Sequence, residues 1–220
     1  MKRAYYESQY GKPYEQYCRE KYPDQADAIC AKAETLYREF LAKDMPDLGE
    51  NMMAKNMNDW FTILAFYEAS DHKLDGEALL EIKRRAVDRM RFLGCFVDGN
   101  KSQWPYRLFE KTYVNFNKMC AEHQAKGEWM DTWKVELNPE HRTEGFAFHL
   151  VGCPIAKHAK AHGYEDLLPY LCRTDHMLAE VMHARLIRTQ TEALGGDYCD
   201  YWYVGDKSKA AEQYKDLELI

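Results

Sequence analysis

The sequence predicts an α+β fold: an N-terminal helical layer packed on a small, mostly antiparallel sheet, with a long C-terminal helix. Two patterns along the chain predict it. Up to residue 127, apolar residues recur every three or four positions, which is the spacing of amphipathic helices. After residue 128, short runs alternate between apolar and polar residues and end at glycine or proline, as antiparallel strands do.

The 220 residues are predicted to form a single domain, because a chain of this length can bury a core of its own. Its parts are a tyrosine-rich arm (1–25), a helical half (26–127), the sheet with the motif residues (128–204) and a charged tail (205–220). The arm carries six of the 16 tyrosines. We expect it to pack on the domain itself or on a second copy of the chain in a homodimer.

Four helices are predicted in the helical half. Residues 26–43 and 50–69 carry apolar residues at helical spacing, and a proline and a glycine separate them. Asp75 is the expected N-cap of the third helix, which Gly94 ends. The fourth helix covers about 105–125. The residues of this helix expected to face inward are Leu108, Phe109, Thr112, Tyr113, Phe116, Met119 and Cys120.

The second half is predicted to combine strands with two more helices. Proline suits the first position of a helix and glycine its end, which places a short helix between Pro154 and Gly163. A much longer helix is expected over about 166–193, closed by a double glycine. The strands are expected near residues 133–137, 146–150 and 198–204.

Composition excludes several classes of function. The chain is 46% hydrophobic and 30% charged, which is typical of a folded protein. Its net charge of −6 argues against nucleic-acid binding, since there is no basic excess to neutralise phosphates. The longest apolar run, 60–67, is far shorter than the roughly 20 residues that span a bilayer, and no secretion leader is visible. We therefore expect a cytoplasmic protein whose partner is a small molecule, with no nucleic acid and no membrane.

Seven cysteines, an odd number, indicate reduced thiols rather than a disulfide framework. Cys153 is the most suggestive of them, because it stands directly before Pro154, the expected first residue of a helix. The free N–H groups and the dipole of a helix N-terminus stabilise a thiolate and lower its pKa. Cys153 is therefore either a nucleophile or a buried turn residue.

Several polar groups are expected to share one face of the long helix. Cys172, Asp175, His176 and His183 recur there at helical spacing. Such a face is either a solvated surface or the wall of a polar pocket with Asp175 or His176 as the acid or base. We expect His183 to be an ordinary core or surface histidine.

The most unusual stretch is LIRTQTEALGGDYCDYWYV, residues 186–204. Helix capping explains its arginine and its two glycines. Capping does not explain the polar residues that follow, because aspartate is rare in strands. The stretch therefore indicates a functional site that contains Thr189, Thr191, Asp197, Cys199 and Asp200.

Zinc is the one metal that the cysteines suggest. The intervals from Cys153 to Cys172 and from Cys172 to Cys199 are 19 and 27 residues, so no C-x-x-C signature is present. Three thiols from a helix start, a helix face and a strand would still form a site with His176 or Asp175 as the fourth ligand. We expect no cofactor, with zinc at these cysteines as the alternative.

Two stretches together resemble a known family. GCPIAKHAKAHGYEDLLPYLCRTDHMLAE, residues 152–180, followed by the stretch at 186–204, is similar to the L-2-amino-thiazoline-4-carboxylic acid hydrolase family. The pattern is Cys-Pro, then C-x-x-D, then R-T-x-T-x-x-x-G-G-D-x-C-D. The resemblance is strong over about 145–204, and the helical first half is compatible with it.

The resemblance implies hydrolytic opening of a cyclic amidine, at a carbon–nitrogen bond of an aminothiazoline ring, to a carbamoyl-cysteine. The ring carbon between nitrogen and sulfur is the electrophile, and a cation is needed for the substrate carboxylate. A helix start makes Cys153 our first choice of nucleophile, ahead of Cys199. Arginine suits a carboxylate because its planar fork pairs with two oxygens. The site residues expected are Cys153, Cys199, Asp175, Asp200 and Cys172 for catalysis, and Arg188, Thr189, Thr191, Asp197 and His176 for substrate binding.

One departure from the family pattern bears on the substrate. The last strand of the family usually reads Cys-Asp-Phe-Arg, whereas this chain has Cys199, Asp200, Tyr201 and Trp202. If that arginine binds a charged group of the substrate, the aromatic ring of Trp202 in its place predicts a ligand that is less acidic or more aromatic. His176 stands where the pattern has an aromatic residue.

Two other classes of function stay open. The arrangement is also similar, more loosely, to the four-vinyl-reductase type of small-molecule-binding domain, which implies a non-catalytic sensor, in some cases with zinc. Such a sensor binds its ligand without turnover. An interaction protein that dimerises through the tyrosine arm is the third class. It predicts that changing the three C-terminal cysteines alters stability alone.

Overall fold

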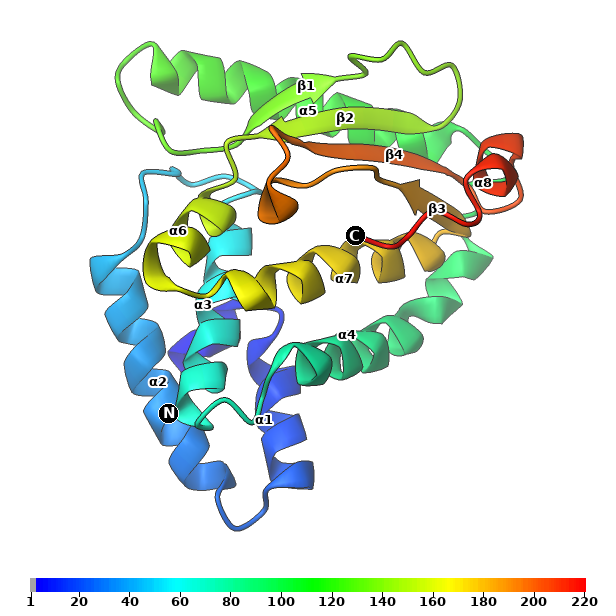
Figure 1. Ribbon diagram of the computed structural model, residues 1–220. Helices are drawn as coiled ribbons and strands as arrows, with labels where there is room; N and C mark the ends of the chain where they lie inside the picture. Colours follow the sequence, from blue (N-terminus) through cyan, green and yellow to red (C-terminus); the bar gives the residue numbers. More distant parts are fainter. Residues whose placement is uncertain (1–2) are drawn as a thin grey trace.

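The computed structural model describes residues 3–220, apart from the side chain of Leu93, and shows a four-stranded antiparallel sheet with helices packed around it (Figure 1). The predicted α+β fold is confirmed. The elements are η1 (Ala4–Glu7), α1 (Gly11–Lys21), α2 (Ala26–Lys43), α3 (Lys55–Ala69), α4 (Gly76–Met90), η2 (Arg91–Cys95), α5 (Trp104–Gln124), β1 (Lys134–Leu137), β2 (Phe146–Val151), α6 (Pro154–His162), η3 (Glu165–Leu167), α7 (Leu168–Glu180), β3 (Ala184–Ile187), η4 (Glu192–Leu194), β4 (Cys199–Gly205) and α8 (Lys209–Gln213).

The four helices predicted in the first half are confirmed as α2, α3, α4 and α5. Asp75 caps α4 as expected, since its carboxylate accepts a hydrogen bond of 3.1 Å from the main-chain N–H of Ala78. α4 ends at Met90, before Gly94, because the chain continues as a 3₁₀ turn, η2. Two residues expected to face inward from α5 do not: Leu108 is 55% and Phe109 39% exposed.

The tyrosine-rich arm packs on the rest of its own chain. Tyr5, Tyr10 and Tyr14 are buried in the main hydrophobic cluster, which extends through α2 and α3 to the sheet. The rings of Tyr5 and Tyr14 both contact Phe66 of α3, with centroids 5.0 Å and 5.1 Å away. Of the two expected partners of the arm, the domain itself is therefore the one that buries these three rings.

The sheet has the strand order β1-β2-β4-β3, and each neighbouring pair is antiparallel. In the central pair, Leu150 lies opposite Cys199 and Phe148 opposite Tyr201. Side chains alternate between the two faces of a strand, so Cys199 and Tyr201 share the face that packs toward the protein interior. Asp200 lies between them and points to the other face.

The long C-terminal helix predicted over 166–193 is wrong. α7 ends at Glu180, and after a short turn Ala184–Ile187 form β3, which pairs with β4. His183 in the turn has a φ of +49°, which ends helical geometry, and its carbonyl accepts a hydrogen bond of 2.9 Å from the Asp206 N–H. A short apolar run fits a helix or a strand equally well from sequence, and pairing with β4 decides here. His183 therefore does not share a helix face with Cys172.

None of the helices between residues 3 and 220 is long and apolar enough to cross a membrane. The helices instead cover the sheet. α5 lies along β1 and β2, whereas α7 lies below the sheet between β3 and α4 (Figure 1). The short α6 follows β2, and its N-cap residue is Cys153. Cys153, residues of the sheet and one side of α7 together line a cavity.

Candidate active site

A cavity of about 220 Å³ lies between the inner face of the sheet and the helices α3, α4 and α7. It is smaller than the roughly 300–1,000 Å³ of sites that hold drug-sized ligands, so it suits a compact small molecule. The structure brings four of the ten predicted site residues to its wall: Cys153, Cys172, Asp175 and Cys199.

Cys153 is the N-cap of α6, as predicted. Its backbone is extended, Pro154 opens the helix, and Sγ accepts a contact of 3.5 Å from the main-chain N–H of Ala156. The expected lowering of its pKa does not follow, however. Burial raises the pKa of the Cys153 thiol, and the Glu192 carboxylate, which accepts hydrogen bonds from the Gly152 and Cys153 N–H groups at 2.6 and 2.9 Å, adds to the rise.

The other two thiols of the cavity are also held in the neutral form. Burial raises the pKa of Cys172 and of Cys199 to about 12. The Cys199 Sγ accepts a hydrogen bond of 3.3 Å from the Glu192 N–H, which offsets this only in part. A thiolate nucleophile would therefore have to be generated by a base inside the cavity.

Asp175 is the candidate for that base. Its side chain is 37% exposed and reaches the cavity from α7. Its Oδ2 accepts hydrogen bonds of 3.0 Å from the Arg188 guanidinium and of 3.0 Å from the Tyr201 hydroxyl. Its Oδ1 has no hydrogen-bond partner in the part of the chain that the structure describes, so this oxygen is free to accept a proton or an N–H group from a ligand.

Arg188 lies behind Asp175 and outside the cavity wall. The residue is fully buried, and its donors reach the carbonyl oxygens of Ile220 at 2.8 Å and Cys172 at 2.6 Å as well as Asp175. The guanidinium also lies over the Tyr201 ring at 5.1 Å. Since the residue is fully buried and does not line the cavity, the geometry gives Arg188 the role of holding Asp175, whereas the sequence predicted that it binds the substrate carboxylate.

The remaining predicted site residues lie away from this cavity. His176 bonds through Nε2 to the Ile220 carbonyl at 2.9 Å, and the Thr191 hydroxyl caps η4 by accepting from the Leu194 N–H at 3.3 Å. Strand alternation explains the position of Asp200. Asp200 points to the opposite face of the sheet, where its carboxylate accepts from the Thr189 N–H and hydroxyl, and Asp197 is exposed.

Trp202 also lies on the face opposite the cavity. Its indole N–H donates to the Glu144 carbonyl at 2.8 Å, and the Arg142 guanidinium lies 4.1 Å from the ring centroid. Trp202 therefore does not line the 220 Å³ cavity, and its departure from the family pattern leaves the charge of that cavity unchanged.

Sequence reasoning missed two charged residues of the cavity wall, Asp59 of α3 and Lys83 of α4. Both are buried, with 7% and 8% exposure. A signal was available for Lys83, because it stands four residues after Leu79 and four before Val87, in the middle of an apolar stripe. Lysine is almost never buried unless it is paired, so a lysine in such a position is a candidate functional residue.

One of three comparisons with known proteins identifies a family. The family model described as L-2-amino-thiazoline-4-carboxylic acid hydrolase matches residues 53–203, more than half of the chain. The chain belongs to this family. Membership assigns it to a family named for a hydrolase, and the matched span contains Asp59, Lys83, Cys153, Asp175 and Cys199. No curated protein and no solved structure matches the chain.

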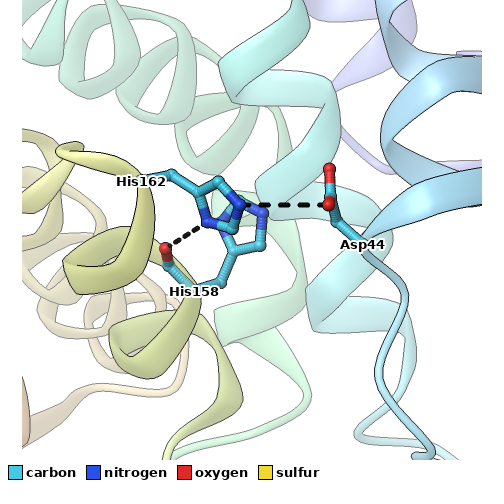
Figure 2. Close-up of side chains that lie close together, drawn as sticks. All are labelled: Asp44, His158 and His162. Carbon is cyan, nitrogen blue, oxygen red and sulfur yellow. Dashed lines mark hydrogen bonds and ion pairs between the residues drawn. The ribbon is translucent and has the colours of Figure 1, made fainter.

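The three cavity thiols of this family member do not form a compact metal-binding group. The one group within residues 3–220 whose ligand atoms all lie within 4.8 Å of one another is Asp44, His158 and His162 (Figure 2). It lies where α6 faces the end of α2, and a contact of 3.9 Å joins His162 Nε2 to an Asp44 carboxylate oxygen.

The tautomer of His158 argues against metal binding at this group. The Trp60 indole N–H donates to His158 Nδ1 at 3.1 Å, so the neutral ring carries its proton on Nε2, and neither nitrogen offers a free lone pair. The rings of His158 and His162 also stack, with centroids 4.2 Å apart and 21° between their planes. Lone pairs in two nearly parallel, stacked rings cannot both point at one ion.

His158 is instead expected to make stability depend on pH. Burial, followed by the neighbouring His162, lowers the pKa of His158 to about 4. As pH falls from about 6.5 to 4, the unfolded chain therefore binds a proton that the folded chain excludes, and stability is lost by up to about 3 kcal/mol. His158→Asn, whose side-chain oxygen still accepts from Trp60, should flatten this loss.

Urea unfolding of wild type and variant between pH 4 and 7 measures the effect. The control is His141→Asn, at an exposed position whose φ of +55° suits asparagine. It should leave the pH profile unchanged. A wild-type profile that is flat below pH 6.5, or one that H158N leaves as steep, would contradict the assignment.

Proposed function

We propose that the cavity hydrolyses a small cyclic amidine such as L-2-amino-thiazoline-4-carboxylic acid to a carbamoyl-cysteine. The observation that carries the proposal is the meeting of three thiols and a partly exposed carboxylate, Asp175, around one cavity of about 220 Å³ in a member of this hydrolase family. The size of the cavity supports a ligand of a single five-membered ring with short substituents.

Water is the proposed nucleophile, because the three thiols are held neutral. Asp175 Oδ1 accepts a proton from water as the water oxygen adds to the ring carbon between nitrogen and sulfur. In this addition to the amidinium the carbon–nitrogen π electrons move onto nitrogen. The tetrahedral intermediate then collapses: its hydroxyl proton passes to solvent as the carbonyl forms, the bond from carbon to the leaving group breaks, and the leaving group takes the proton back from Asp175. In this step Cys153, Cys172 and Cys199 line the site and exclude bulk water.

The bond that breaks decides the product. Cleavage of the carbon–nitrogen bond, expected from the sequence, leaves an amine and a carbamoyl group on sulfur. Cleavage of the carbon–sulfur bond leaves a free thiol and a carbamoyl group on nitrogen. We propose carbon–sulfur cleavage, because a thiol of pKa about 8.5 departs as an anion far more readily than an amine.

Incubation with the substrate at pH 7.5 tests the proposal. We expect the purified protein to release one thiol per molecule consumed, measured with Ellman's reagent and by mass spectrometry of N-carbamoyl-cysteine. A carbamoylated product without a free thiol would move the cleavage to carbon–nitrogen. Binding without any product would favour the non-catalytic sensor instead.

Serine variants of the three thiols test the choice of nucleophile. With water as the nucleophile, Cys153→Ser, Cys172→Ser and Cys199→Ser should each keep measurable turnover. Cys95→Ser is the matched control, since Cys95 is exposed and lies outside the cavity wall. Complete loss in one variant alone, with a mass adduct on that thiol in the wild type, would show covalent catalysis.

A further inference from the structure

Lys83 is a buried cation without a carboxylate partner. It projects from α4 into the cavity wall, and the residue is only 8% exposed. Within residues 3–220 no carboxylate oxygen lies within 4.0 Å of its ammonium, and no hydrogen bond holds it. Its closest charge-stabilising contact is the Tyr10 ring, with Nζ 5.4 Å from the centroid.

A buried ammonium is costly unless it is paired. Here burial lowers the pKa of Lys83, while the more distant Asp175 and Asp59 oppose that change. The ammonium borders the cavity, so an anionic group in the cavity would supply the partner that the protein does not. A carboxylate is the anion that fits a single lysine in a space of about 220 Å³.

The other charges of the cavity are placed apart from Lys83. Asp175 reaches the cavity from α7, and its charge is shared with Arg188. Asp59 reaches it from α3, and its carboxylate accepts hydrogen bonds from the Ser8 hydroxyl at 2.7 Å and the Gln9 N–H at 3.1 Å. A cation and carboxylates on different walls complement a molecule that carries an anion at one end and a cation at the other.

We propose that Lys83 binds the carboxylate of a small zwitterionic amidine whose cationic nitrogens face Asp175. The inference deepens the proposed function and rests on it for the identity of the ring. It also replaces Arg188 as the carboxylate-binding residue, because Arg188 is fully buried outside the cavity wall and bonds to Asp175 and to two carbonyl groups. Lys83 is thereby the residue that selects for a carboxylated substrate.

Two aromatic probes test this without turnover, because their flat ring resists hydrolysis: 2-aminothiazole-4-carboxylate and 2-aminothiazole. Calorimetry on the wild type should show the carboxylated probe binding at least about tenfold more tightly. Lys83→Met should weaken that probe by about 10- to 100-fold and leave 2-aminothiazole nearly unchanged. Lys83→Arg, which keeps the cation, should retain a preference for the carboxylated probe.

Lys111→Met, on the exposed side of α5, is the matched control and should bind both probes as the wild type does. Methionine fills the space of the lysine stem and removes a buried charge, so K83M is expected to fold, which circular dichroism checks. Equal loss of both probes in K83M, an unchanged preference in K83M, or no binding of either probe to the wild type would overturn the inference.

The hydrolysis assay separates this inference from the proposed function. Carboxylate selectivity that depends on Lys83, without hydrolysis of the thiazoline acid, would uphold the binding site and reject the reaction. Hydrolysis in which K83M still prefers the carboxylated substrate over 2-amino-2-thiazoline would uphold the reaction and reject the role of Lys83.

Discussion

Asp175→Asn is expected to lower kcat for thiazoline hydrolysis by about 10²- to 10⁴-fold, the range in which a general base contributes. The amide cannot take a proton from water, yet it keeps the shape of the side chain and still accepts from Arg188 and Tyr201. KM should change much less than kcat. Initial rates of thiol release over a range of substrate concentrations measure both constants.

The matched control for this prediction is Asp166→Asn, an exposed aspartate of η3 that lies outside the cavity wall and should leave both constants unchanged. Wild-type rates in D175N would assign the base to another residue of the cavity, with Asp59 the next to be changed.

Arg188→Met is expected to lower the free energy of unfolding by about 1.5–3 kcal/mol, because a fully buried, hydrogen-bonded guanidinium is removed from a carboxylate, Asp175, that is 37% exposed and therefore still partly hydrated. The fully buried guanidinium bonds to two groups of α7, the Asp175 carboxylate and the Cys172 carbonyl. It also bonds to the carbonyl of Ile220, 32 residues further along the chain. Methionine removes the Arg188 donor from all three acceptors, although Asp175 keeps its hydrogen bond from Tyr201 and Ile220 its contact with His176. Urea unfolding followed by circular dichroism gives the difference.

Arg84→Met is the control, because Arg84 pairs with Glu180 at an exposed position, with a side chain that is 38% accessible. Exposed pairs contribute about 0–1 kcal/mol, so this variant should remain close to the wild type. If R188M unfolds as the wild type does but loses carboxylate selectivity, Arg188 and not Lys83 reads the substrate. R188M therefore also tests which cation, Arg188 or Lys83, binds the substrate carboxylate.

The helical half was predictable from sequence because its signals are local. The apolar spacing of residues 26–43 gives the bounds of α2, and an aspartate before a glycine marks the start of α4. β3 was not predictable in this way. Its four residues continue the periodicity of α7, and only their pairing with β4, 15 to 21 residues further along, makes them a strand.

Only those residues of the candidate site that belong to the family motif could be predicted from the sequence. Cys153, Cys172, Asp175 and Cys199 follow from the motif, and the structure brings them to one wall. The role of Arg188 did not follow, because its partner at Ile220 lies 32 residues away in an unremarkable tail. Lys83 was not predicted either: its place in the apolar stripe of α4 was the available signal, but a lysine in an amphipathic helix is usually solvated.

Successive side chains of strand β4 point to opposite faces of the sheet, so its odd- and even-numbered residues have different surroundings. Cys199 and Tyr201 belong to the cavity, whereas Asp200 and Trp202 belong to the opposite face with Arg142. Substitutions at Cys199 and Tyr201 would thus alter substrate preference, whereas substitutions at Asp200 and Trp202 would act on the packing of the opposite face. For a directed-evolution library aimed at new cyclic amidines, Cys199 and Tyr201 are the positions of β4 to randomise.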